Sequence, residues 1–243
     1  MAYRHFEFIE KHAWLLGILI AVGVSLGGLA EITPLYFQAL KVRPADGTKP
    51  YDALRLTGRD VYVREGCYLC HSQMIRTLRF ETQRYGHFST ANESVYDRPF
   101  QWGSKRTGPD LARVGGKYSD LWHVDHLNDP RSVVPTSIMP GYPFLSTTPL
   151  KTDDIQDHMK AQAALGVPYS KEMIANALSD LRAQASNDAP EAEDLRKRYQ
   201  NVIVRKFDNN KAFVSEADAI VAYLQMLGTQ VDFKAYQDKA NLR

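Results

Sequence analysis

The residues best able to do chemistry stand in one short run, Cys67-Tyr-Leu-Cys-His71, which contains the only two cysteines of the chain. A disulfide framework normally uses more cysteines at wider spacings. A tetrahedral zinc site needs four nitrogen or sulfur ligands, and no second CxxC or HxxxH partner exists. C-x-x-C-H is instead the attachment pattern of a c-type haem. We therefore expect one covalent haem c on Cys67 and Cys70, with His71 as the proximal ligand.

A sixth iron ligand must come from elsewhere in the chain. Met74 is too near His71 to cross the ring, and methionines 159, 173 and 226 stand in helical patterns, where methionine is more often core filler. Met139 is the preferred ligand, because it lies in a stiff, proline-rich stretch that can hold its thioether over the iron. His/Met ligation would give a six-coordinate, relatively high-potential iron suited to electron transfer. The alternatives left open are His87, His123 and His126.

Four further residues are candidates for contacts with the haem or its ligand. The carbonyl group of Pro109 is expected to accept from the ring N–H of His71, as outer-sphere partners of metal-bound histidines do. The alternative is an ordinary turn proline. Trp122, Arg113 and Arg131 are candidates for the haem propionates, and the alternatives are packing for the tryptophan and solvated charge for the two arginines.

Two helices are expected to bracket this pocket. The first is predicted to start at Thr57 as N-cap and to carry Gly58 and Tyr62. The last is capped by Ser215 and carries Tyr223. A glycine at the crossing would allow the close approach expected in a cytochrome c core, whereas the alternative is a pair of unrelated amphipathic helices.

An apolar run near the N-terminus, Ala13 to Ala30, contains 18 residues without a charge. At about 1.5 Å per residue it spans roughly 27 Å, close to the hydrocarbon core of a bilayer. The alternative is a cleaved signal peptide ending at Gly28-Leu-Ala30, but the run exceeds the usual length of a signal-peptide apolar region. We expect an uncleaved anchor in the lipid bilayer, and Gly23 and Gly27 favour a partner helix.

The charges around this segment, counted alone, favour a cytoplasmic C-terminal side. Haem attachment on the outer side of the membrane argues the reverse, and long domains translocate largely regardless of charge. We expect a single-pass protein of the bacterial inner membrane, with a cytoplasmic N-terminus and a periplasmic haem domain. The formal net charge of +2 gives no reason to expect nucleic acid as a partner.

The expected fold is mainly α: one transmembrane helix, then a class I cytochrome c-like domain with a helical insertion. Residues 78–106 read as a long ordered loop, the prolines of 135–149 exclude a helix, and Val202 to Phe207 reads as a short strand. The expected divisions are a cytoplasmic N-terminus 1–12, an anchor 13–37, a linker 41–56, a haem core 57–150, an insertion 151–214, a C-terminal core helix 215–228 and a tail 229–243.

Longer motifs go beyond a generic cytochrome c. They are Cys67-Tyr-Leu-Cys-His-Ser-Gln-Met-Ile-Arg76, Glu81-Thr-Gln-Arg-Tyr-Gly86, Asp97-Arg-Pro-Phe-Gln-Trp-Gly-Ser-Lys-Arg-Thr-Gly-Pro-Asp-Leu111, Trp122-His-Val-Asp-His-Leu127, Asp129-Pro-Arg131 and Pro135-Thr-Ser-Ile-Met-Pro140. In these the chain closely resembles the monohaem cytochrome c subunit (subunit II, FixO/CcoO type) of cbb3-type cytochrome c oxidase. The resemblance is strong over the anchor and residues 57–150, and weak over 151–214.

The resemblance implies a relay of electrons from a dihaem cytochrome c subunit to haem b of a catalytic copper–haem b subunit. That complex reduces oxygen to water and pumps protons. The subunit is then a non-catalytic part of an oxidoreductase, and small membrane subunits are further partners. Residues 76–106 are implied to dock on the catalytic subunit, where a shared calcium ion would involve Ser104 or leave it a plain loop serine. A cytochrome bc1 complex is a further partner considered for the insertion.

Two other functions fit the anchor and a single haem motif. One is a membrane cytochrome c of another respiratory complex, such as the small subunit of nitric oxide reductase, or a tethered electron shuttle. Neither would be expected to carry the Trp102-Gly-Ser-Lys-Arg106 loop. The other is a haem sensor or structural protein, which would usually leave an open axial site and bind carbon monoxide.

Overall fold

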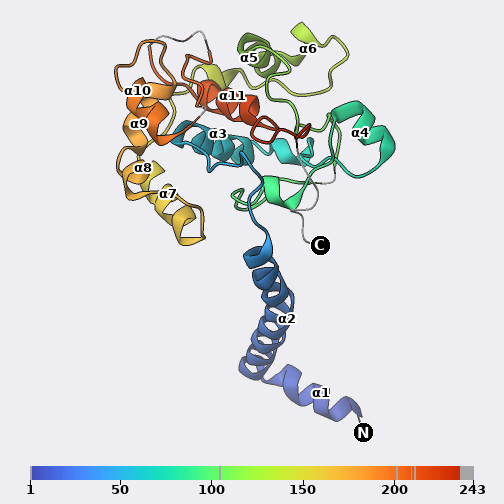
Figure 1. The fold of residues 1–243 in the computed structure, drawn as a ribbon. Helices are drawn as coiled ribbons and strands as arrows, with labels where there is room; N and C mark the ends of the chain where they lie inside the picture. The colour runs from blue at the N-terminus through green and yellow to red at the C-terminus, as the bar shows by residue number, and fades with distance from the viewer. Residues whose placement is uncertain (1, 104, 201, 209, 211, 236–243) are drawn as a thin grey trace. The chain divides into compact units, whose positions relative to one another are not determined.

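A computed structural model describes residues 2–103, 105–200, 202–208, 210 and 212–235, which form two units. The first unit ends at Arg43 and contains α1 (Ala2–Lys11) and α2 (Ala13–Lys41) (Figure 1). Within α2, Ala13–Phe37 is long and apolar enough to cross a membrane, by length and composition. This agrees with the expected anchor.

The second unit begins at Pro44 and is helical. Its α-helices are α3 (Ala53–Arg64), α4 (Arg79–Tyr85), α5 (Asp120–Asn128), α6 (Pro130–Val133), α7 (Ile155–Ala164), α8 (Lys171–Ala175), α9 (Ala177–Gln184), α10 (Ala192–Arg198) and α11 (Glu216–Met226). Three short 3-10 turns complete it: η1 (Cys67–Leu69), η2 (Ala91–Glu93) and η3 (Pro143–Ser146). No strand occurs among the described residues, so the expectation of a mainly helical protein is confirmed.

Helices α3 and α11 cross at the centre of this unit (Figure 1). A Cβ atom built on Gly58 of α3 would lie 1.9 Å from the carbonyl oxygen of Ala219 on α11, so a residue with a side chain could not occupy this crossing without moving a helix. Tyr62 and Tyr223 meet beside it, with ring centroids 5.5 Å apart. The expected close crossing of the first and last core helices is therefore present.

Residues 151–214 form an excursion whose two ends lie side by side next to the α3–α11 core. Leu150 donates its N–H to Val214 at 2.9 Å, and Glu216 donates to Thr148 at 3.0 Å. Between these ends, helices α7 and α9 pack against α3. Met159 of α7 and Leu181 of α9 are fully buried in the same hydrophobic cluster as the α3 and α11 residues. The segment thus shares one core with the two helices that flank the Cys67–His71 motif.

Four details of the sequence expectations were wrong. Helix α3 begins earlier than Thr57, because the buried carboxylate of Asp52 caps it by accepting from the N–H of Arg55 at 3.0 Å. Residues 78–106 are not all loop, since α4 and η2 lie within them. The prolines of 135–149 still admit the 3-10 turn η3.

The fourth detail is the strand expected from Val202 to Phe207. Its backbone has no partner strand among the described residues. Instead, Lys206 donates its N–H to the side chain of Asn187 at 2.9 Å, and Phe207 donates to Asp218 at 3.0 Å. Side-chain oxygens therefore satisfy the amides that a sheet would have used.

Candidate haem site

The Cys67–His71 motif folds as a single tight turn after α3. The N–H groups of Cys70 and His71 both donate to the carbonyl oxygen of Cys67, at 3.2 and 3.0 Å. Gly66 opens the turn with φ of +70°, a conformation that costs glycine little. One turn of backbone therefore carries both thiols and the imidazole, as attachment of one haem ring requires.

The two thiols differ in their surroundings. Cys70 is exposed, whereas Cys67 is half-buried and packs against the main hydrophobic cluster. Burial, helped by the nearby charge of Glu65, raises the pKa of the Cys67 thiol to about 12. Cys67 is therefore a neutral thiol with one side towards the core, and both sulfurs are free in the chain.

The imidazole of His71 is held from two sides. Its Nδ1 lies 2.8 Å from the carbonyl oxygen of Pro109, which can only accept, so Nδ1 donates and Nε2 is left with its lone pair. A Cβ built on Gly108 would lie 2.2 Å from Cε1 of the same ring. The Pro109 contact is the one expected from the sequence, whereas Gly108 was not singled out. The close approach of the His71 ring explains why residue 108 is a glycine.

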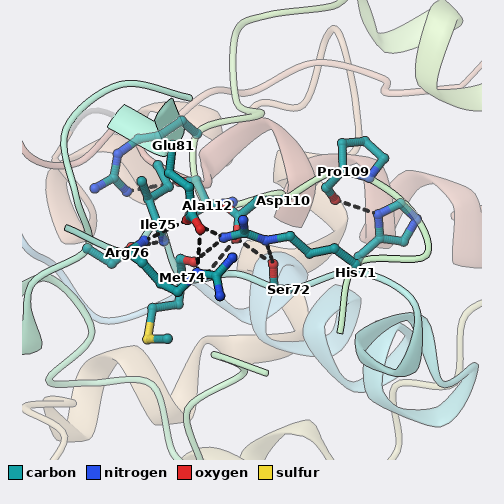
Figure 2. A network of polar contacts seen from close by, with 12 residues as sticks. His71, Ser72, Met74, Ile75, Arg76, Glu81, Pro109, Asp110 and Ala112 are labelled. Atoms are coloured by element: carbon teal, nitrogen blue, oxygen red, sulfur yellow. Dashed lines mark hydrogen bonds and ion pairs between the residues drawn. The ribbon is translucent and has the colours of Figure 1, made fainter. Parts of the chain in front are cut away.

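Residues 70–76 and 106–112 lie side by side and fix each other. The N–H of Gly108 donates to Cys70 at 3.0 Å, and the N–H of Leu111 donates to Ser72 at 2.8 Å. The carboxylate of Asp110 accepts from the Ser72 hydroxyl at 2.7 Å and from the N–H of Met74 at 2.9 Å. The segment after His71 is therefore anchored along its length (Figure 2).

Arg106 links several parts of this network. Its guanidinium donates to the Ser72 hydroxyl at 2.7 Å and to the buried carboxylate of Glu81 on α4 at 2.7 Å. That hydrogen bond to Arg106 is the main cause that lowers the pKa of Glu81 to about 2. The charged pair joins α4 to the backbone that carries His71. Sequence reasoning missed it, because the partners are separated by a stretch without periodicity.

Met139 stands in a loop that is tied back to α5. Its own N–H donates to the Ser137 hydroxyl at 3.2 Å, and the guanidinium of Arg131 donates to the Ser137 carbonyl oxygen at 3.1 Å. After Met139, the N–H of Tyr142 donates to Leu127 of α5 at 2.6 Å. The Met139 side chain is half-buried and packs on the same hydrophobic cluster as Cys67.

Trp122 is half-buried, with a ring on each face. Tyr118 stacks on it at 3.9 Å between centroids, and His126 stacks at 4.7 Å. These contacts describe a packed aromatic column on α5, so they support the packing alternative for Trp122. The Nδ1 atom of His126 is buried and has no hydrogen-bond partner.

Arg113 and Arg131, the two arginine candidates, contact other protein groups in this structure. Arg113 forms an ion pair with Glu93 at 2.8 Å, and its guanidinium stacks on Phe233 at 4.3 Å. Arg131 is exposed and holds the Met139 loop as described above. Ser104, the calcium candidate, lies outside the described residues. Propionate and calcium roles for these residues stay predictions.

The residues present fit a c-type haem. Two free thiols and an imidazole share one turn, and the imidazole already has its Nδ1 proton engaged, so Nε2 is available to iron. Gly108 removes the side chain that would displace the imidazole. Leu111, Met139 and Tyr142 lie half-buried on the same cluster as Cys67 and supply apolar surface for a ring.

Comparison with known proteins agrees with this geometry. No curated protein matches the chain. The family described as cytochrome c oxidase, mono-haem subunit/FixO, matches residues 6–231, which include α2, the haem turn, the insertion and α11. The chain belongs to the mono-haem (FixO) subunit family of cytochrome c oxidase.

Proposed function

We propose that this chain is the monohaem cytochrome c subunit of a cbb3-type oxidase. It relays electrons from a dihaem cytochrome c subunit to haem b of the catalytic subunit, in a complex that reduces oxygen to water and pumps protons. The observation that carries the proposal is the Cys67–His71 turn with its imidazole fixed by Pro109, inside a chain of the FixO family.

A haem bound here supplies one-electron transfer, and the protein supplies attachment and two axial ligands. Cys67 and Cys70 would hold the haem through thioethers, and Nε2 of His71 and the thioether of Met139 would bind its iron. The support for Met139 is its loop, which Arg131, Ser137 and the Tyr142 contact with α5 hold in place. A filled sixth position makes the haem an electron carrier and excludes oxygen.

The segment from Arg76 to Arg106 is proposed as the docking surface for the catalytic subunit. Three of its apolar side chains are exposed: Phe80 is 63% exposed, Phe100 is 53% exposed and Leu78 is 44% exposed. Exposed apolar groups of this kind typically mark protein contacts. Arg106 ties this segment to Ser72, so the surface is rigidly connected to the haem turn.

The remaining parts of the proposal concern placement. Helix α2 anchors the chain in the bacterial inner membrane, with the haem domain in the periplasm, and small membrane subunits pack beside it. A calcium ion shared through Ser104, and contact of the insertion with a cytochrome bc1 complex, are further proposals. The sequence and the family are their only support.

The first test is purification of the full chain from its membrane in mild detergent. We expect a haem c that survives denaturation, measured as the pyridine haemochrome, and a copper–haem b subunit identified by mass. A chain that purifies alone, from membranes with active oxidase, would contradict the proposal.

The second test concerns the axial ligand. Met139→Ala is expected to lose the weak near-infrared sulfur–iron absorption band and to lower the reduction potential, while Met74→Ala keeps both. Persistence of the band in Met139→Ala would remove Met139 from the site.

A further inference from the structure

The imidazole of His126 has a buried polar atom that no hydrogen bond satisfies. His126 is half-buried on α5, and its Nδ1 atom is buried without a hydrogen-bond partner. A buried polar atom without a partner costs free energy, so such groups in native proteins usually have an explanation in function or in a missing ligand. The stack with Trp122 holds the ring in one orientation.

His126 is near enough to His71 for their charges to interact, although the two stand 55 positions apart in the sequence. Burial lowers the pKa of His126, and the neighbouring His71 lowers it further. The sides of His71 towards Pro109 and Gly108 are already occupied. Nε2 is the ring nitrogen that the Pro109 hydrogen bond leaves available, and it is the proposed iron ligand.

The Met139 loop leads back to the same part of α5. Leu127, which follows His126 directly, accepts the N–H of Tyr142 at 2.6 Å. A Cβ built on Gly141 would lie 2.6 Å from the carbonyl oxygen of Asn128. The loop that bears Met139 therefore closes against the helical turn that bears His126.

We propose that His126 lines the haem pocket on the Met139 side of the iron, close enough to occupy the sixth coordination position when the Met139 thioether is absent. In the native protein it is a positioning residue whose imidazole packs beside the thioether. This proposal rests on haem attachment at Cys67–His71, as set out above.

The test uses the full chain in detergent, with the haem content of each variant measured first. Met139→Ala is expected to stay six-coordinate and low-spin by electron paramagnetic resonance, now with two histidine ligands, and not to bind carbon monoxide when reduced. Met139→Ala combined with His126→Leu should become high-spin and bind carbon monoxide. Added imidazole should return this double variant to low-spin, which shows that its pocket is formed.

The matched control is Met139→Ala combined with His123→Leu, one helical turn away. His123 is 4% exposed and packs edge-on against Trp122, so this variant should remain low-spin. The proposal is overturned by a high-spin Met139→Ala chain, by a low-spin His126 double variant, or by loss of the low-spin signal in the His123 control. If Met139→Ala does not retain haem, Met139→Leu is tested by the same criteria. Absence of haem from the wild-type chain would contradict the proposed function itself.

Discussion

At the scale of single residues, the geometry around His71 is controlled by a residue without a side chain. Gly108 lies against the face of the imidazole while Pro109, its neighbour, accepts the ring proton. The two act together, because the hydrogen bond fixes the direction of the ring and the close backbone contact fixes its height above the turn. The proposed iron ligation through Nε2 depends on both.

Gly108→Ala is therefore expected to displace the His71 ring. The added Cβ would start 2.2 Å from Cε1, and overpacking of this kind typically costs about 1–3 kcal/mol. We expect less haem attached per chain, by pyridine haemochrome, and a shifted reduction potential in the fraction that carries it. The exposed neighbour provides the control: Thr107→Ala should match the wild type in both measurements. An unchanged potential and haem content in Gly108→Ala would show that the backbone contact is unimportant.

Because of Glu81, the free energy of unfolding is expected to fall as the pH becomes acidic. Its pKa is lowered to about 2, mainly by the hydrogen bond from Arg106. A depressed carboxyl pKa contributes stability above the ordinary pKa of about 4.3, and this contribution is lost as pH falls from there towards 2. Glu81→Gln should cost about 1–3 kcal/mol at pH 7, since the half-buried guanidinium of Arg106 loses its charged partner.

The measurement is urea unfolding of the full chain in detergent at pH 7, 5, 4 and 3. The stability difference between wild type and Glu81→Gln should be constant from pH 7 to 5 and should shrink below that. Glu172→Gln, whose carboxylate is 69% exposed, is the control and should show little difference at any pH. A stability difference between wild type and Glu81→Gln that grows as the pH falls would contradict a lowered pKa for Glu81.

At the scale of elements, the parts foreseen from sequence were those with a local signal. Ser215 was expected as an N-cap, and its hydroxyl accepts from the N–H of Asp218, three residues on. The Gly58 crossing followed from one small residue in the first core helix. By contrast, α4 has only seven residues and an exposed apolar face, so its pattern is indistinguishable from loop. Its pairing with Arg106 depends on tertiary structure and leaves no trace in spacing.

The insertion was expected only as a helical segment, and its sequence did not show how it packs. In the structure Leu181 is fully buried in the cluster that holds α3 and α11. Leu181→Ala should therefore destabilise the whole haem unit by about 2–5 kcal/mol, in a single transition that also includes the haem absorbance. Leu165→Ala, at a position 61% exposed in the same segment, should cost little. Two separate unfolding transitions in Leu181→Ala would mean that the insertion folds independently.

At the scale of the whole molecule, the two cysteines allow the membrane topology to be tested. If both thiols are used in thioethers to haem, the wild-type chain has no thiol left to react with a maleimide, since it contains only Cys67 and Cys70. A single cysteine introduced elsewhere then reports on which side of the membrane its position lies. Glu10 on α1 and Leu165 after α7 are both exposed and lie on the two sides of α2 in sequence.

In spheroplasts, a membrane-impermeant maleimide should label Leu165→Cys but label Glu10→Cys only after lysis. The physical reason is that haem attachment on the outer side requires the domain after α2 to have crossed, whatever the charges beside the helix favour. The wild-type chain, treated with the same reagent, should stay unlabelled before and after lysis. Labelling of Glu10→Cys in sealed spheroplasts would reverse the orientation, and labelling of the denatured wild type would instead show that the thiols carry no haem.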